Sequence, residues 1–438
     1  MTEADQQARR PSAADVGSEE GLRAELEPRS RTKARRVLVI APQPFFVERG
    51  TPIAVRYVLD ALHQLGFEAD VLTLPLGRDI DIGDGQIVRM PNPLGFTSVP
   101  VGFSLRKLVF DAFLLADLAR RLRARDYACI HAVEEGGLLV LLARGRRRIP
   151  LVYDMQSSLP EQLAQKPILR AAPLQAIFRR IEAYLLRHAS AVVCSAGLAD
   201  HARALAPRAP IVEWRFPAAR RDVAPEEVAE LRRELDVEPE TPVVLYTGNF
   251  AEYQGVGLLL DALADIRRGA PNAVLVLVGA ADQREIDTVH DRLDEDLRAG
   301  VRCVLRQPRE RIDAFIAMVT ILVSPRSYGG NFPLKVFDYL AAGKPIVATD
   351  VPTHRVVLDD SLALLVEPRA AACAQGIVRA LTDQGLAARL AASARRYADR
   401  ELSWPRFVAL VDDIYRVALR RQTEGVEDRA EPDEVGGN

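Results

Sequence analysis

The sequence is short of cysteine and histidine, and neither residue type occurs in a metal-binding or redox pattern. Its four cysteines, among 438 residues, lie 65, 109 and 70 positions apart, which excludes a C-x2-C pair. The six histidines are scattered and lack the spacing of metal ligands. We therefore expect no bound metal ion, no cofactor, and free thiols of the kind found in a reducing compartment.

Excess charge and long apolar runs are also missing. The 58 basic and 60 acidic side chains leave a net charge of −2, which excludes a general attraction to nucleic acid. The longest apolar stretches, at 137–143 and 315–323, are far shorter than the roughly 18 or more residues of a membrane-spanning helix. Residues 1–34 contain no apolar signal-peptide core. These absences predict a cytoplasmic protein without a nucleic-acid partner.

Large apolar side chains are scarce at both ends of the chain, so residues 1–34 and 421–438 are predicted to be disordered tails. Between them, short β-branched runs alternate with segments of helical period, a pattern typical of doubly wound α/β domains. A polar segment with three prolines, 214–240, interrupts the alternation and is predicted to be a hinge. The remaining boundaries predict two Rossmann-like domains, over 35–213 and 241–403, which face a central cleft. A closing helix is predicted over 404–420.

The most informative segment, residues 324–350, reads as a strand end, a glycine turn, a helix and a second strand. Pro333 favours the first helical turn, with Asn331 or Phe332 at the cap. Free backbone amides at such a helix start bind phosphate. Lys335 falls in the same turn, where a cation is unfavourable to the helix dipole unless an anion is bound beside it.

Asp338 lies three positions after Lys335, on the same face of the predicted helix. A carboxylate beside a phosphate site is suited to accept hydrogen bonds from ribose hydroxyls. The alternative is a plain turn followed by a solvated lysine and a surface carboxylate. The combination of these residues on a second α/β domain favours a nucleotide site over that alternative.

The segment from Pro333 to Pro345 resembles the donor motif of glycosyltransferase family four, in the branch that reads P-L-K-x-x-[DE]-Y-x-A-x-G-K-P. Segments 42–56, 246–256 and 402–415 are similar to the family's N-terminal glycine loop, its loop after the first C-terminal strand, and its closing segment. The resemblance implies a GT-B fold and a retaining, metal-independent glycosyltransferase. It further implies a nucleotide-diphosphate sugar as donor, such as a UDP-sugar, and a glycan or lipid-linked hydroxyl as acceptor.

The resemblance also implies roles for individual residues. In the C-terminal domain, Lys335 is expected to stabilise the leaving diphosphate, and the donor is expected to contact Gly248, Asn249, Gln254, Arg326, Asn331, Phe332, Leu334 and Asp338. In the N-terminal domain, His131 is expected at the sugar site, and acceptor contacts are expected from Gly50, Thr51, Glu134 and Asp154. The alternatives are that His131 only closes a strand and that Glu134 only caps a helix.

Two departures from the family pattern leave other functions open. Gly330 stands where many relatives carry a glutamate, and Asn249 and Gln254 stand where many carry a basic pair. The phosphate charge would then be met by Lys335, helix-end amides and Arg326. The rival interpretations are a GT-B sugar-nucleotide epimerase and a catalytically silent scaffold.

A predicted amphipathic helix over 105–125 has basic residues at both ends. It is interpreted either as a core helix with one solvated side or as a peripheral contact with the inner face of a membrane that carries a lipid-linked acceptor.

Overall fold

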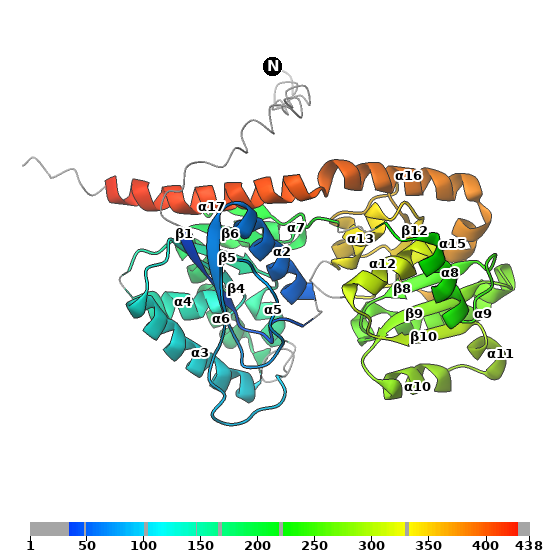
Figure 1. The fold of residues 1–438 in the computed structure, drawn as a ribbon, viewed down its shortest axis with the longest axis horizontal. Coiled ribbons are helices and arrows are strands. Elements are labelled where there is room, and N and C mark those ends of the chain that lie inside the picture. Colours follow the sequence, from blue (N-terminus) through cyan, green and yellow to red (C-terminus); the bar gives the residue numbers. More distant parts are fainter. Residues whose placement is uncertain are drawn as a thin grey trace, which may run out of the picture.

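The structure is a computed structural model that describes residues 35–47, 50–99, 104–145, 147–164, 169–218, 222–328 and 333–427. Its N-terminal sheet has seven parallel strands in the order β3-β2-β1-β4-β5-β6-β7 (Figure 1). Their bounds are β1 Arg35–Ala41, β2 Phe67–Thr73, β3 Ile87–Arg89, β4 Cys129–Val133, β5 Leu151–Met155, β6 Ala191–Cys194 and β7 Ile211–Glu213. The helices around this sheet are α2 Gly50–Gln64, α3 Leu105–Ala124, α4 Gly136–Arg144, α5 Leu159–Ala164, α6 Ala172–His188 and α7 Ala196–Leu205.

The C-terminal sheet repeats this topology with six parallel strands in the order β10-β9-β8-β11-β12-β13. The strands are β8 Val243–Thr247, β9 Val274–Ala280, β10 Val301–Leu305, β11 Ile321–Ser324, β12 Ile346–Thr349 and β13 Leu364–Val366. The helices around this sheet are α8 Pro225–Glu234, η2 Glu252–Gln254, α9 Val256–Gly269, α10 Gln283–Asp291, α11 Glu295–Arg298, α12 Arg309–Ala317, α13 Lys335–Ala341, α14 Pro352–Arg355, α15 Ala370–Thr382 and α16 Gln384–Glu401. The last helix, α17 Trp404–Glu427, returns to the N-terminal domain.

Both sheets have the strand order of a doubly wound α/β domain, which confirms the predicted fold class. Their strands are mainly apolar because helices cover both faces of each sheet and leave no face for alternating solvated side chains. The order reverses between β1 and β4 and between β8 and β11. In such folds the carboxyl ends of the strands at this reversal face the ligand.

Two predicted boundaries need correction. The segment 214–240 is not a hinge throughout, because α8 lies within it, packs against α12 and buries Leu231. The predicted tail from residue 421 was also wrong in its first part, since α17 continues to Glu427. A helix that tertiary packing has nucleated propagates at little further cost, even through a polar sequence. Residues 1–34 and 428–438, the remainder of the predicted tails, lie outside the described residues.

The chain passes between the domains at two neighbouring places. Residues 214–218 leave the N-terminal sheet, and residues 402–404 connect α16 to α17, which packs against α2 and strands β4 to β6 (Figure 1). The two passages are joined by a hydrogen bond in which the Ala218 backbone N–H donates to the Leu402 carbonyl, 3.0 Å apart. The C-terminal helix therefore completes the N-terminal domain.

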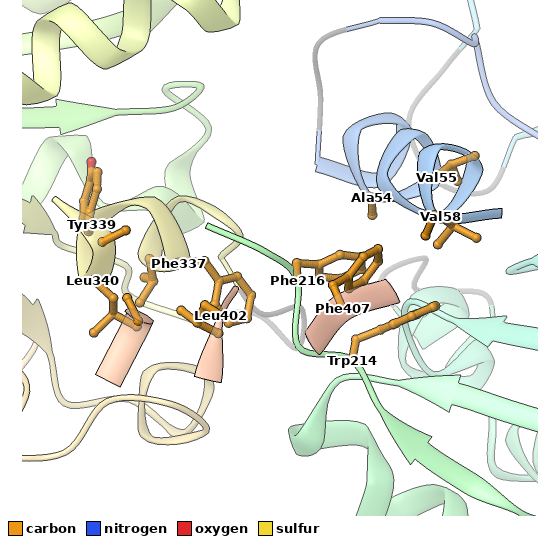
Figure 2. Packing of buried hydrophobic residues seen from close by; sticks show 14 of the residues in the cluster. Ala54, Val55, Val58, Trp214, Phe216, Phe337, Tyr339, Leu340, Leu402 and Phe407 are labelled. Carbon is orange, nitrogen blue, oxygen red and sulfur yellow. The ribbon is translucent and has the colours of Figure 1, made fainter. Parts of the chain in front are cut away.

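Aromatic side chains fill the junction between the domains. Phe216 lies 5.2 Å from Trp214, 5.8 Å from Phe407 of α17 and 6.4 Å from Phe337 of α13, measured between ring centroids. Figure 2 shows these rings between α2 and α13, with Leu402 on the C-terminal side. One apolar cluster thus extends from the N-terminal core through the junction into the C-terminal core.

The basic helix predicted over 105–125 corresponds to α3. Its apolar face is buried in the N-terminal core through Phe110, Leu114, Leu118 and Leu122. Four cations in or next to the helix are paired with neighbouring carboxylates: Lys107 with Glu135, Arg120 and Arg121 with Asp117, and Arg125 with Asp70. This geometry favours the interpretation of α3 as a core helix. Across the described part of the chain, no helix combines the length and apolarity that crossing a membrane requires.

Candidate functional site

A pocket lies where the two domains meet. It is lined by Gly50, Thr51, Met155, Gln156, Ser195 and Ala196 of the N-terminal domain, Trp214 and Phe216 of the junction, and Leu334, Phe337, Val356 and Val357 of the C-terminal domain. The domains approach closely here, because a Cβ atom added to Gly50 would lie 3.8 Å from Leu334 Cδ1. The structure thus brings three predicted site residues together, namely Gly50, Thr51 and Leu334.

Lys335 begins α13 with a buried ammonium group. Its Nζ has no hydrogen-bond partner among the described residues and lies 3.9 Å from the centroid of the Tyr246 ring. Burial, with a smaller contribution from Arg326, holds the pKa of Lys335 well below its ordinary value. Gly248, with φ of 136°, lets the loop approach this group closely, since a Cβ there would lie only 2.8 Å from Nζ. The loop after β8 is therefore shaped around an unpaired cation.

Arg326 is a second buried cation near Lys335, with 4% of its surface exposed. Its Nε donates to the Tyr328 carbonyl at 3.0 Å, and its guanidinium lies 5.1 Å from the Tyr253 ring centroid. Burial lowers the pKa of Arg326. Among the residues described, no carboxylate raises the pKa of either Arg326 or Lys335. Two neighbouring cations without a counter-charge form a site suited to an anion.

A buried histidine that the sequence analysis did not identify, His354, holds the strand ends next to this site. His354 Nδ1 lies 2.7 Å from the Thr349 carbonyl, to which it donates, and its Nε2 accepts from Ser324 Oγ at 2.9 Å. Burial, the hydrogen bond and the nearby cations together leave the pKa of His354 at about 4, so the ring is neutral at pH 7. Thr349 Oγ in turn donates to the Arg326 carbonyl. The network holds the ends of β11 and β12, from which Arg326 projects.

The predicted donor contacts Asn249 and Gln254 take part in the loop's own structure. The Asn249 carbonyl accepts from Tyr246 Oη at 2.7 Å, and its side-chain Oδ1 accepts from the Ala251 N–H at 3.1 Å. Gln254 is buried, with its Oε1 3.5 Å from Tyr246 Oη. Gly255 has φ of 79°, and a Cβ there would lie 1.9 Å from the Pro325 carbonyl oxygen. These contacts fix the loop against β11.

Asp338 has a partner that the sequence did not reveal. Its two carboxylate oxygens accept from the Arg309 guanidinium at 2.6 and 2.8 Å. Burial raises the pKa of Asp338, and Arg309 opposes that rise. Asp338 is therefore not the surface carboxylate of the alternative interpretation, and its contact with ribose remains a prediction. Asn331 and Phe332, and Gly330 beside them, lie outside the described residues.

His131 was expected at the sugar site, but it does not lie at the cleft end of its strand. It occupies the middle of β4, is 1% exposed, and is not among the residues that line the pocket. Its Nδ1 is hydrogen-bonded to Tyr415 Oη of α17 at 3.0 Å, and its Nε2 lies 3.7 Å from Asp154 Oδ2. β4 continues to Val133, which carries the strand end beyond His131. His131 therefore does not close the strand, as the alternative held, but lies inside it and packs against α17, which favours a structural role.

The Tyr415→Phe substitution tests that role. It removes one neutral hydrogen bond in the N-terminal core, so the free energy of unfolding is expected to fall by about 1 kcal/mol. Donor turnover should be unchanged, because Tyr415 does not line the pocket. Chemical denaturation and a turnover assay measure the two quantities. A large loss of turnover at unchanged stability would instead support a catalytic role for His131.

The two predicted acceptor carboxylates lie at the ends of adjacent strands. Glu134, with φ of 49°, follows β4, and its Oε1 accepts from Ser157 Oγ and Gln162 Nε2, both at 3.1 Å. Burial, followed by the neighbouring Glu135, raises the pKa of Glu134. No side chain caps α4, so the capping alternative for Glu134 does not hold.

Asp154 follows a similar pattern at the end of β5. It is 1% exposed, and its Oδ1 accepts from Trp214 Nε1 at 2.9 Å and from Gln156 Nε2 at 2.8 Å. Both of these partners line the pocket. Asp154 thus acts on the pocket through the residues that it holds.

Two families match the chain in sequence order. The Glycosyl transferase 4-like domain matches residues 49–215, and Glycosyl transferases group 1 matches residues 227–397. The phosphatidyl-myo-inositol mannosyltransferase of Mycobacterium tuberculosis is 27% identical over 186 residues, 39% of this chain and 46% of that protein. The D-inositol 3-phosphate glycosyltransferase of Corynebacterium aurimucosum is 26% identical over 197 residues, with 43% and 46% covered. The match thus spans less than half the length of these curated relatives.

Solved structures resemble the whole fold. Sucrose-phosphate synthase of Thermosynechococcus elongatus aligns with a TM-score of 0.69 at 20% identity, covering 88% of this chain and all of that one. Anabaena HepE in complex with UDP and glucose aligns with a TM-score of 0.64 at 17% identity, covering 90% and 100%. The family matches together cover both domains, and the paired Rossmann-like sheets are those of the GT-B fold, so the chain belongs to the GT4-type glycosyltransferases.

Proposed function

We propose that the protein transfers a sugar from a nucleoside-diphosphate donor to a hydroxyl group of an acceptor, with retention of anomeric configuration. The observation that carries this proposal is the pair of buried cations, Lys335 and Arg326, at the place where the loop after β8 packs closely against Lys335 at Gly248. Buried cations without counter-charges are unfavourable unless a ligand supplies the missing negative charge. A diphosphate supplies it and accepts several hydrogen bonds at once.

The same two cations suit the chemical step. Negative charge grows on the diphosphate as the glycosidic bond breaks, and donors aimed at that charge stabilise the transition state more than the ground state. The family resemblance implies front-face retention, in which a leaving phosphate oxygen takes the acceptor's proton. The proposal therefore requires no protein nucleophile, and the structural position of His131 is compatible with it.

Known proteins of this fold support the choice of ligands. The HepE structure is a complex with UDP and glucose, so UDP-sugars are the first donors to test. The curated relatives are named for phosphatidyl-myo-inositol and D-inositol 3-phosphate. We accordingly propose a glycan or lipid-linked acceptor in the cytoplasm, with peripheral membrane contact where the acceptor is a lipid.

Release of UDP or GDP from a panel of sugar nucleotides, with and without polyol acceptors, tests the proposal. Acceptor-dependent release supports transfer. Conversion of the donor without an acceptor would support the epimerase, and UDP binding without any donor consumption would support the silent scaffold.

Metal dependence is tested in the same assay. Turnover is expected to be unchanged in EDTA, because Lys335 and Arg326 are assigned the diphosphate charge that a divalent cation neutralises in other enzymes. The described residues contain no cluster of three or more side chains able to hold a metal ion. Loss of turnover in EDTA that Mn²⁺ or Mg²⁺ restores would contradict this assignment.

A further inference from the structure

The ring of His354, on α14, is fully buried, and both of its nitrogens have partners. Its Nδ1 lies 2.7 Å from the Thr349 carbonyl and 3.3 Å from Thr349 Oγ1, and its Nε2 lies 2.9 Å from Ser324 Oγ. A carbonyl can only accept, so Nδ1 carries the proton and Nε2 accepts from the serine hydroxyl. The partners thus select one tautomer and one orientation of the ring.

The ring makes these two contacts in its neutral form. An imidazolium carries a proton on each nitrogen, so it could not accept from Ser324. Burial above all lowers the pKa of His354 to about 4, helped by Arg326 and Lys335 and opposed by the hydrogen bond to the Thr349 carbonyl. At neutral pH the ring is therefore one fixed donor and one fixed acceptor.

Thr349 connects this ring to Arg326. The Thr349 hydroxyl is buried and donates its single hydrogen to the Arg326 carbonyl, 2.5 Å away. The N–H of His354 approaches the oxygen of the same hydroxyl, which leaves the hydroxyl hydrogen free for that carbonyl. Residues 325–327 lie outside any helix or strand, so contacts of this kind determine where the Arg326 backbone lies.

The side chain of Arg326 is held at one end. Its Nε donates to the Tyr328 carbonyl at 3.0 Å, and the guanidinium lies 5.1 Å from the Tyr253 ring centroid. None of the described residues accepts a hydrogen bond from its two terminal nitrogens. These nitrogens are the donors that remain for a diphosphate, and a shift of the Arg326 backbone would move them.

We propose that His354 is a positioning residue for the transfer reaction, and that it acts through Thr349 to set the direction in which Arg326 faces the diphosphate. None of the surface of His354 is exposed, so it acts without touching the donor. This inference rests on the proposed function and adds a residue from outside the contacts expected for the donor. Loss of His354 should therefore weaken the contacts of the phosphates and leave those of the nucleoside unchanged.

Comparing UDP with uridine separates this role from a purely structural one. The ratio of the two affinities measures what the phosphates contribute to binding. His354→Leu and Thr349→Val should each lower this ratio by about tenfold or more, as the loss of a hydrogen bond to a charged group implies. Each should also lower kcat by about ten- to a hundredfold, because a displaced donor stabilises the leaving diphosphate less well. Calorimetric titration with UDP, competition by uridine and turnover assays measure these effects.

Two further variants test the path through Thr349. His354→Asn should recover most of the UDP preference, since its amide N–H can replace Nδ1–H toward the Thr349 carbonyl. His354→Gln places its amide nearer the position of Nε2 and should recover less. The double variant His354→Leu with Thr349→Val should lose no more of the preference than either single variant, because both changes act on the same path.

Val289→Ala, in the core of the same domain on α10, is the matched control for lost stability. It should melt at a lower temperature and keep the preference for UDP over uridine. An unchanged preference in the Thr349→Val protein or in a folded His354→Leu protein overturns the inference. Better recovery by Gln than by Asn, or additive losses in the double variant, also overturns it.

The parent protein separates this failure from that of the proposed function. A parent that binds UDP no more tightly than uridine overturns both the proposed function and the inference. A parent that strongly prefers UDP, with a preference that the Thr349→Val protein keeps, overturns the positioning role alone. Thr349→Val decides the question by itself if His354→Leu does not fold, because valine has the shape of threonine and removes only the hydroxyl.

Discussion

The Lys335→Met protein is expected to turn over its donor about a hundredfold more slowly than the parent, or slower still, the effect of removing one donor aimed at the developing charge. UDP affinity should fall with it. Without nucleotide the variant should be at least as stable as the parent, because methionine keeps the packing on Tyr246 and removes a buried charge that has no partner among the described residues. Turnover, calorimetry and thermal melting measure the three effects.

The pH dependence of the same lysine gives an independent check. Its pKa is lower in the folded protein than in the unfolded chain, so the unfolded chain binds more protons between those two values. Stability of the nucleotide-free protein should therefore rise as pH rises through that interval, and Lys335→Met should lose this contribution. A bound diphosphate favours the ammonium form, so UDP binding in that interval should take up protons. Calorimetry in buffers of different ionisation enthalpy measures this uptake.

Lys344→Met is the matched control for these measurements. Lys344 is also partly buried with a lowered pKa, but it follows the end of α13, whereas Lys335 begins that helix, so UDP affinity should be unchanged. If Lys335→Met binds UDP as the parent does, or melts far below it, Lys335 is structural. The phosphate contact would then have to come from Arg326 alone.

Asp338→Ala is expected to destabilise the protein by about 2–3 kcal/mol, which lowers the melting temperature of a domain this size by about 5–10 °C. The substitution leaves the Arg309 guanidinium without the carboxylate that binds it through two hydrogen bonds. Both side chains are mostly buried, with 28% and 15% exposed, so solvent replaces the lost contact only in part. Thermal melting and UDP calorimetry are measured on the same samples.

A double variant, Arg309→Met with Asp338→Leu, separates the two roles of Asp338. Replacing both charges with apolar side chains should recover part of the stability, because neither member of the pair is left buried alone, while Asp313, 3.7 Å from Arg309, loses that contact. UDP affinity should stay reduced if the carboxylate also contacts ribose. An Asp338→Ala protein that melts like the parent but binds UDP weakly would show that the ion pair contributes little and that the carboxylate serves the nucleotide.

Most of the fold follows from local patterns in the sequence. The alternation of short β-branched runs with helical segments predicted the doubly wound domains, and β6 is one such run, which needs no information from elsewhere in the chain. α8 was missed because it is short and mostly charged and contributes little beyond Leu231 to the core. Its position depends on α12, which lies far away in the sequence.

The candidate site was predicted in part for the same reason. The position of Lys335 in the first helical turn predicted a cation without a local partner. In the structure its Nζ has no hydrogen-bond partner among the described residues. The partners of Asp338 and His131 lie 29 and 284 positions away in the sequence. Such pairs depend on which elements the fold brings together, and a single sequence carries no local signal for them.

The route of α17 has a consequence for how the protein is made. The helix covers β4 to β6 and buries Phe407, Val411 and Ile414 in the core that contains the N-terminal domain. During synthesis the N-terminal domain emerges first, and domains generally fold in that order. Here the ribosome must make the entire C-terminal domain before residues 404–427 become available. The N-terminal domain therefore exposes an uncovered apolar surface for the time that translation of some two hundred residues takes, and it becomes complete only after the C-terminal domain has been synthesised.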